Sequence, residues 1–167
     1  MEFGSFYEQT VHRSYGFALG LTGDAAEAQD LVQEAYARAW ERWRVVRSAD
    51  SPAAWVATVI RRLSANRWRH LAVMRRHTPT LAQERQETTI DTELPIDLLW
   101  ALQQLNSDER SAVVLHYVAA YTAVEVAEIL GRPVGTVKAL TYRARKKLAV
   151  LLADYQAPRT CTGVKEG

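Results

Sequence analysis

Two stretches of this sequence carry cations without any acid, a pattern that favours binding to a polyanion. The first runs from Arg61 to His77 and places arginines around Trp68. The second runs from Arg132 to Lys147 and contains both lysines and arginines. Cations without local counter-ions gain free energy when they displace the ions condensed around phosphates. A solvated helix face would explain one such stretch, but two stretches in separate segments favour nucleic acid as the partner.

The two stretches predict different kinds of nucleic-acid contact. Trp68 is a candidate for stacking on an unpaired base while its neighbouring arginines follow the phosphates, which suits single-stranded DNA. Trp55 is expected to lie at least partly in the core. The second stretch predicts a helix-turn-helix that turns at Gly131 and places a longer basic helix in the major groove, with a helix pair that binds no DNA as the alternative. The candidates on that helix for base and phosphate contacts are Lys138, Thr141, Tyr142, Arg143 and Arg145.

The overall charge does not argue against a nucleic-acid partner. The chain has 21 Lys plus Arg and 19 Asp plus Glu, so its formal net charge is only +2. The signs are segregated, however: acids concentrate in residues 24–43 and 84–97, and the two basic stretches contain none. The average charge therefore hides two cationic surfaces.

The residue types that carry catalysis or bind metals are sparse. Cys161 is the only cysteine, which excludes an intramolecular disulfide and a cysteine-based zinc site. The histidines have no carboxylate at metal-ligand spacing, and no phosphate-binding glycine loop or nucleophile motif occurs. We therefore expect no enzyme activity, no metal and no cofactor. No apolar run is long enough to span a membrane and no signal peptide is visible, so we expect a cytoplasmic protein.

Apolar residues recur at helical spacing and predict an all-α fold that begins with three helices, over residues 3–21, 24–43 and 51–71. Asp24 and Glu27 form an approximate capping pair at the start of the second helix. The third helix is expected to begin at Ser51-Pro52, because serine is a good N-cap and proline fits the first helical turn.

Further helices are expected in the C-terminal part of the chain, over residues 96–105, 107–119, 123–130 and from 133 to about 155. Ser107 is the expected N-cap of the second of these. Thr122 and Glu125 form a capping box that opens the third.

Residues 78–94 separate these two groups of helices and are rich in helix breakers and acids. They predict a flexible linker, since a long unstructured loop is uncommon inside one compact domain, which is the alternative. The expected organisation is a first helical domain over 1–77, the linker over 78–94, a second helical domain over 95–155 and a disordered tail over 156–167.

Three segments, in this order, resemble the extracytoplasmic-function sigma factors, the compact class of sigma-70-type RNA polymerase initiation subunits. Residues 30–40 (DLVQEAYARAW) resemble the family's region-two helix, and 54–56 with the arginines that follow resemble its promoter-melting helices. Residues 130–138 (LGRPVGTVK) with 142–145 are similar to its region-four recognition segment. The resemblance implies an all-α protein of two small domains that directs core polymerase to promoters and is not itself an enzyme.

The resemblance also implies roles for particular residues. A first set would melt and read the minus-ten element as single-stranded DNA, with a flipped base in a protein pocket: Arg61, Arg62, Asn66, Arg67, Trp68 and Arg69. A second set would bind the minus-thirty-five element in its major groove: Arg132, Thr136, Lys138, Ala139, Tyr142, Arg143 and Lys146. A third set would bind the polymerase clamp, while the second domain also meets the polymerase flap: Asp30, Gln33, Glu34, Arg38 and Trp40. An anti-sigma factor is a further expected partner.

The sequence departs from the family pattern at three places, one of which is Asn106, where the family usually has a proline. Arg62 and Asn66 stand where the family usually has Asn and then Asp, and 139–141 read Ala-Leu-Thr where it usually has Ser-Arg-Leu. Two other interpretations remain open: a free-standing helix-turn-helix regulator that binds duplex operators, and a helical adaptor that binds only proteins.

Overall fold

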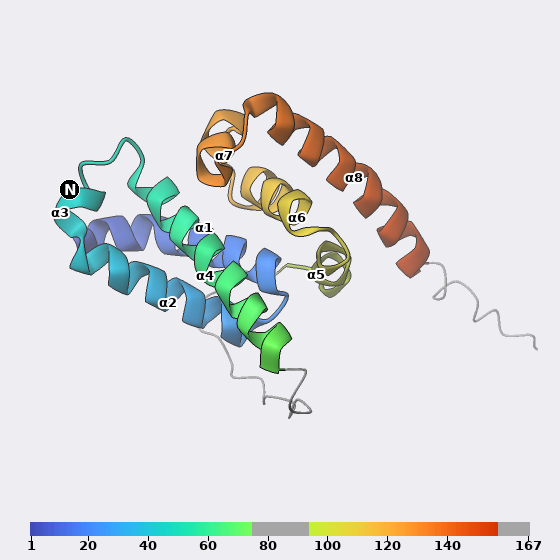
Figure 1. Ribbon diagram of the computed structural model, residues 1–167, viewed down its shortest axis with the longest axis horizontal. Helices are drawn as coiled ribbons and strands as arrows, with labels where there is room; N and C mark the ends of the chain where they lie inside the picture. The colour runs from blue at the N-terminus through green and yellow to red at the C-terminus, as the bar shows by residue number, and fades with distance from the viewer. Residues whose placement is uncertain (75–93, 157–167) are drawn as a thin grey trace, which may run out of the picture.

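The computed structural model describes residues 1–74 and 94–156, and in these residues every regular element is a helix, which confirms the predicted all-α fold (Figure 1). The predicted linker lies outside the described residues except for Leu94. The predicted tail also lies outside them except for Gln156, and so does Cys161.

Residues 1–74, which we call the first module, contain α1 (Phe3–Thr22), α2 (Ala25–Glu41), the short α3 (Trp43–Val46) and α4 (Pro52–Met74). The predicted cap of α2 is confirmed, because the Asp24 side chain accepts a hydrogen bond from the backbone N–H of Glu27 at 2.9 Å. Gly23 ends α1 in the left-handed conformation (φ 67°), which glycine adopts without strain. The predicted helix over 24–43 ends early, since Trp43 begins α3.

Residues 94–156, the second module, contain α5 (Ile96–Gln103), α6 (Ser107–Val113), the π-helix η1 (Val114–Val118), α7 (Ala123–Leu130) and α8 (Val134–Gln156). The capping box of α7 is confirmed: Thr122 Oγ1 accepts from the Glu125 N–H at 3.2 Å, and the Glu125 carboxylate accepts from the Thr122 N–H at 2.7 Å. Gly131 then ends α7 with φ 63°, as the predicted turn requires.

Two details of the second module differ from the prediction. Asn106, not Ser107, is the N-cap of α6, and its side chain accepts from the Glu109 N–H at 2.8 Å. Both residue types cap helices well, and Asn106 has the extended backbone of a cap while Ser107 is already helical. The predicted helix over 107–119 also widens into η1 after Val113, which nothing in the apolar periodicity indicated.

The two modules pack against each other along α1 and α4, where α1 contacts α5 and η1 and α4 contacts α7. Gly20 of α1 lies so close to Val114 that a Cβ atom on Gly20 would be 2.5 Å from Val114 Cγ1. The Arg13 side chain donates to the carbonyl of Ala119 at 2.5 Å and stacks 3.5 Å above the Tyr121 ring. We call this contact between the two modules the seam. Burial there raises the pKa of the Tyr121 hydroxyl to about 12. The buried apolar residues of both modules form one cluster.

Candidate nucleic-acid interface

Helix α4 carries its cations on two different sides. Ser51 caps it by accepting from the Ala54 N–H at 3.2 Å, and Val56, Ile60 and Leu63 are buried. Because successive residues of a helix point about 100° apart, the neighbouring residues Arg61 and Arg62 project in different directions.

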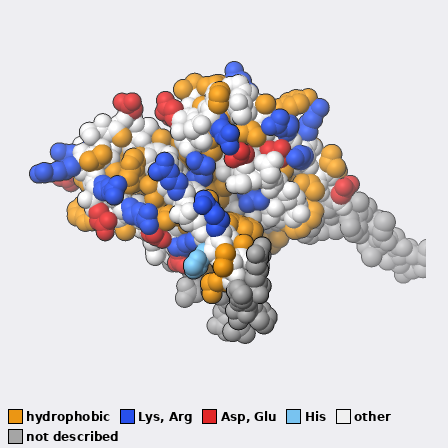
Figure 2. Space-filling view, viewed as in Figure 1, with side chains coloured by type: hydrophobic (Ala, Val, Ile, Leu, Met, Phe, Trp, Pro, Cys, Tyr) orange, Lys and Arg blue, Asp and Glu red, His pale blue; other side chains and the backbone are white. Residues whose placement is uncertain are grey.

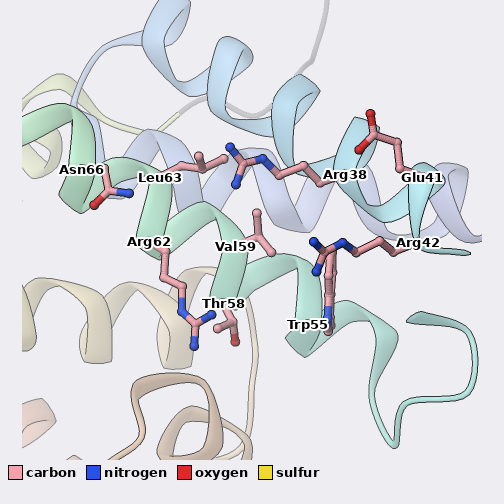
Figure 3. A pocket seen from close by; sticks show the side chains of 9 residues that line it. All are labelled: Arg38, Glu41, Arg42, Trp55, Thr58, Val59, Arg62, Leu63 and Asn66. Atoms are coloured by element: carbon pink, nitrogen blue, oxygen red, sulfur yellow. The ribbon is translucent and has the colours of Figure 1, made fainter. Parts of the chain in front are cut away.

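Arg62 lies on the side of α4 that borders a cavity of about 720 Å³ beside the C-terminal end of α2. This volume is within the range of ordinary ligand sites. Figure 3 shows Arg38 and Arg42 reaching from α2 and the turn after it toward α4. The cavity is lined by Arg38, Glu41, Arg42, Trp55, Thr58, Val59, Arg62, Leu63 and Asn66.

We call this cavity the strand site. Its lining contains three guanidinium groups and one carboxylate, and although Arg38 is paired with Glu34 outside the cavity, the lining carries a net positive charge. An indole ring and the Asn66 amide lie beside the arginines, and such groups can stack on a base and bond to its edge. Figure 2 shows lysine and arginine side chains gathered over both modules on the same face of the molecule.

Arg61 and Trp68 line a different, smaller cavity of about 320 Å³ in the seam between the modules, together with Ser107, Arg110 and Ser111 of α6. Burial lowers the pKa of Arg61, and the Asp108 carboxylate partly opposes this effect. Arg61 Nε is buried and has no hydrogen-bond partner among the described residues. The structure thus separates these two predicted minus-ten residues from Arg62 and Asn66.

Arg67 and Arg69 complete the predicted minus-ten set. Arg67 donates to the Glu34 carboxylate at 3.2 Å, and Arg38 bonds to the other oxygen of Glu34 at 2.7 Å. Glu34 therefore joins α4 to α2 and brings together residues that were predicted to serve DNA and polymerase separately. Arg69 is exposed.

The outer face of α2 presents the residues predicted to bind polymerase. Asp30, Gln33 and Arg38 are exposed and Glu34 is half-buried. Trp40 is 63% exposed although its ring packs edge-on against Phe3, with 5.1 Å between ring centroids. The opposite face is fixed to α1: the Tyr36 hydroxyl lies 2.7 Å from Thr10 Oγ1 and 2.9 Å from Ser14 Oγ.

Helix α8 has one buried and one exposed side. On the buried side, Val137, Leu140, Ala144 and Leu148 lie in the core and Leu151 packs against it partly buried. Thr141, a candidate for DNA contact, is half-buried and donates to the Val137 carbonyl at 3.0 Å. The residues of the predicted minus-thirty-five set are all exposed: Arg132, Thr136, Lys138, Ala139, Tyr142, Arg143 and Lys146. We call this exposed set the groove face.

Acidic side chains of α6 border the groove face. The second basic stretch contains no acid in its own sequence, but the fold brings Asp108 and Glu109 next to it. Glu109 pairs with Lys147 at 2.9 Å and lies 3.7 Å from Arg143, while Asp108 pairs with Arg132 at 3.1 Å.

Sequence reasoning assigned no site role to six residues that line the strand site: Glu41, Arg42, Trp55, Thr58, Val59 and Leu63. The helical spacing of Trp55, Thr58, Arg62 and Asn66 could have placed them on one face of α4. Arg42 and Glu41 come from the end of another helix, and no local pattern indicates that they meet α4.

Other chemistries find little support in the described parts of the chain. Residues 1–74 and 94–156 contain no group of His, Cys, Asp and Glu side chains that could hold a metal ion. In the same residues, no helix combines the length and the apolar character that crossing a membrane requires.

Comparison with known proteins identifies the family. Residues 6–73 match the family model of sigma-70 region 2, and residues 97–148 match that of sigma-70 region 4. The ECF RNA polymerase sigma factor SigL of Mycobacterium tuberculosis is 31% identical over 93% of this chain and 91% of its own length. SigJ of the same organism is 36% identical over 85% of this chain, which spans only 48% of SigJ.

Solved structures agree with the sequence comparison. One similar structure is that of the sigma factor RpoE in complex with the anti-sigma factor NepR from Bartonella quintana. The match covers 90% of this chain and 96% of the RpoE chain, with a TM-score of 0.74 and 25% sequence identity. SigJ of M. tuberculosis matches with a TM-score of 0.61 and 31% identity, over 87% of this chain and 53% of its own. The chain therefore belongs to the extracytoplasmic-function RNA polymerase sigma factors of the sigma-70 family.

Proposed function

We propose that this sigma factor recognises its promoter through two surfaces, the strand site of the first module and the groove face of the second. The observation that carries this proposal is the strand site, where three guanidinium groups, an indole ring and an amide line one open cavity. Each of these groups suits a melted strand, since guanidiniums bind phosphates and the ring stacks on an unpaired base.

At the strand site, Arg62 and Asn66 bind the minus-ten element after its base pairs open. A base leaves the stack and enters the cavity, and contacts with the base and the phosphates offset an unstacking cost of a few kcal/mol. Arg67 and Arg69 extend the basic surface along α4. Arg61 and Trp68 face the seam in the present arrangement of the modules, so their contacts with DNA remain predictions.

At the groove face, α8 enters the major groove of the minus-thirty-five element while α7 crosses the backbone. The contacts to bases and phosphates come from Arg132, Thr136, Lys138, Ala139, Tyr142, Arg143 and Lys146. Phosphate contacts fix the register of the helix, and base contacts provide the sequence specificity.

The outer face of α2, with Asp30, Gln33, Glu34, Arg38 and Trp40, binds the polymerase clamp, and the helices before α8 bind the flap. Catalysis belongs to the polymerase, so this chain is not an enzyme, and it acts in the cytoplasm. Residues 1–77 and 95–155 are the two functional domains, joined by the linker over 78–94.

An anti-sigma factor is a further proposed partner. RpoE from B. quintana, whose fold covers 90% of this chain, was solved in complex with the anti-sigma factor NepR. A protein of that kind would hold this chain away from polymerase.

Reconstituted transcription tests the proposed function. Core polymerase with this chain should initiate at a small set of promoters, and the aligned upstream DNA should contain two separate conserved elements. A free-standing helix-turn-helix regulator would instead bind duplex operators tightly without polymerase. Tight operator binding together with no promoter-specific initiation would reject the sigma-factor mechanism.

A further inference from the structure

A buried carboxylate lies beneath the basic residues of α8. Glu109, in α6, has a side chain that is only 3% exposed, although the cations around it are more than half exposed. Its two oxygens accept from Lys147 Nζ at 3.0 and 2.9 Å. An uncompensated charge in such a place would be very unfavourable, so Glu109 depends on these cations.

The same carboxylate also faces Arg143. Arg143 Nε lies 3.7 Å from Glu109 Oε1, and the Arg143 side chain remains 56% exposed. Arg143 and Lys147 are one turn apart on α8, so a single carboxylate can restrain both. Nε is the guanidinium nitrogen that faces Glu109, so the terminal N–H groups are not the ones that this ion pair engages. These terminal groups are the ones that form paired hydrogen bonds with a guanine or a phosphate.

We propose that Glu109 is a positioning residue for minus-thirty-five recognition: it holds the Arg143 guanidinium in the orientation that contacts DNA and anchors α8 through Lys147. This inference rests on the proposed function of the groove face. Glu109 itself does not touch DNA, since its carboxylate is buried and acidic. Its effect on promoter choice therefore passes through Arg143.

A purely structural role is the competing explanation. In that case Glu109 and Lys147 would only fasten α8 to α6, and the direction of the Arg143 guanidinium would not depend on them. The two explanations differ in one respect: only the positioning role couples Glu109 to discrimination at the base pair that Arg143 contacts.

The first experiment replaces the ion pair by apolar side chains of similar length, Glu109→Met with Lys147→Met, because such replacements of buried ion pairs are often neutral for stability. Transcription is measured on promoters changed at each minus-thirty-five base pair, and Arg143→Ala identifies the pair that Arg143 contacts. The double variant should keep its unfolding midpoint and polymerase binding, yet lose at least about fivefold of its discrimination at that pair. Wild-type discrimination in the folded double variant would overturn the proposal.

A second measurement decides the question even if the double variant unfolds. Glu109→Gln is combined with Arg143→Ala, and discrimination is measured for the two single variants and the pair. If Glu109 acts through Arg143, Glu109→Gln reduces discrimination alone but adds no loss in the Arg143→Ala background. Independent, additive losses would overturn the proposal. Glu128→Gln, which removes an exposed carboxylate of α7, is the control for a simple change of charge and should discriminate as wild type does.

Failure of the underlying function gives a distinct result. If the wild-type protein initiates equally on all minus-thirty-five variants, the groove face itself is not a recognition surface. If the wild type discriminates and Glu109→Gln does not change the pattern, only the positioning role of Glu109 is rejected.

Discussion

Arg61 and Arg62 are neighbours in α4, but their side chains line two different cavities. Arg62 lines the open strand site, whereas Arg61 lines the seam with α6, where burial lowers its pKa. Of these two arginines, we expect Arg62 to meet the DNA strand directly, whereas Arg61 would do so only if the second module moved. Two arginines adjacent in the sequence therefore lie at different sites: Arg62 at the strand site and Arg61 in the seam.

We predict that Arg62→Ala weakens binding of the sigma–polymerase complex to a single-stranded minus-ten oligonucleotide by about tenfold, because it removes a guanidinium from a site that binds phosphates and bases. Fluorescence anisotropy with the labelled oligonucleotide measures the effect. Arg44→Ala is the matched control, since Arg44 is an exposed arginine of α3 that does not line the cavity. Equal losses in both variants would mean that only general charge matters.

Glu27 provides a prediction about stability. Burial raises the pKa of its carboxyl group, and the neighbouring charges of Asp24 and Asp30 raise it further, against an opposing effect of Arg67. Its Oε1 atom is buried without a hydrogen-bond partner among the described residues. The folded protein therefore binds this proton more tightly than the unfolded chain does, and stability falls as the pH rises through the interval between the two pKa values.

Glu27→Gln should accordingly raise the free energy of unfolding at pH 7, because it removes the desolvated charge. The advantage should shrink as the pH falls below the ordinary glutamate pKa of about 4.3, where the wild-type carboxyl is protonated in both states. Urea unfolding of both proteins at pH 7 and pH 4 measures this. A variant less stable than wild type at pH 7 would show that the attraction to Arg67 outweighs burial.

At the scale of elements, local signals predicted the helices well where a cap and an apolar face agree. Asp24 and Thr122 cap α2 and α7 as expected, because capping depends only on residues a few positions apart. The cap of α6 was assigned one residue late, since Asn106 and Ser107 are both suitable. Local patterns do not indicate contacts between residues that are distant in sequence. Three features depend on such contacts: the widening into η1, the ion pair of Glu109 with Lys147, and the approach of Arg42 to α4.

The capping box allows a test of the helix that precedes the groove face. Thr122→Ala removes the acceptor for the Glu125 N–H and should cost about 1 kcal/mol of stability. Thermal unfolding measures the change, and Thr122→Ser, which keeps the hydroxyl, should restore most of the loss. If Ser behaves like Ala, the hydroxyl is not what stabilises α7.

At the scale of the whole molecule, side chains of α5 and α6 bond to backbone carbonyls of α1 beside the cavity that the seam contains. Arg110 donates to the carbonyls of Leu102 and Leu105 at 2.8 Å and reaches the Leu21 carbonyl at 3.4 Å, so one side chain ties the end of α5 to α1. Gln103 adds a bond to the Gly20 carbonyl at 3.3 Å. Gly20 also lies close to Val114, and its missing side chain leaves room for the Val114 methyl groups.

Gly20→Ala should disturb this seam, because its Cβ would lie 2.5 Å from Val114 Cγ1 and the modules must shift to admit it. We expect a loss of about 1–3 kcal/mol, as in other overpacked cores, and a larger radius of gyration in small-angle X-ray scattering. Gly4→Ala is the matched control in the same helix, where a Cβ meets nothing within 4 Å. Unchanged stability in Gly20→Ala would show that the modules do not pack in this way.

The central claim is that two separate surfaces recognise two promoter elements. Initiation by core polymerase with Arg143→Glu, measured on promoters with intact or altered minus-thirty-five elements, tests this claim most directly. The account predicts that the variant binds core polymerase nearly as wild type does but no longer distinguishes the intact minus-thirty-five element from the altered one. Retained discrimination, or an equal loss of polymerase binding, would contradict it.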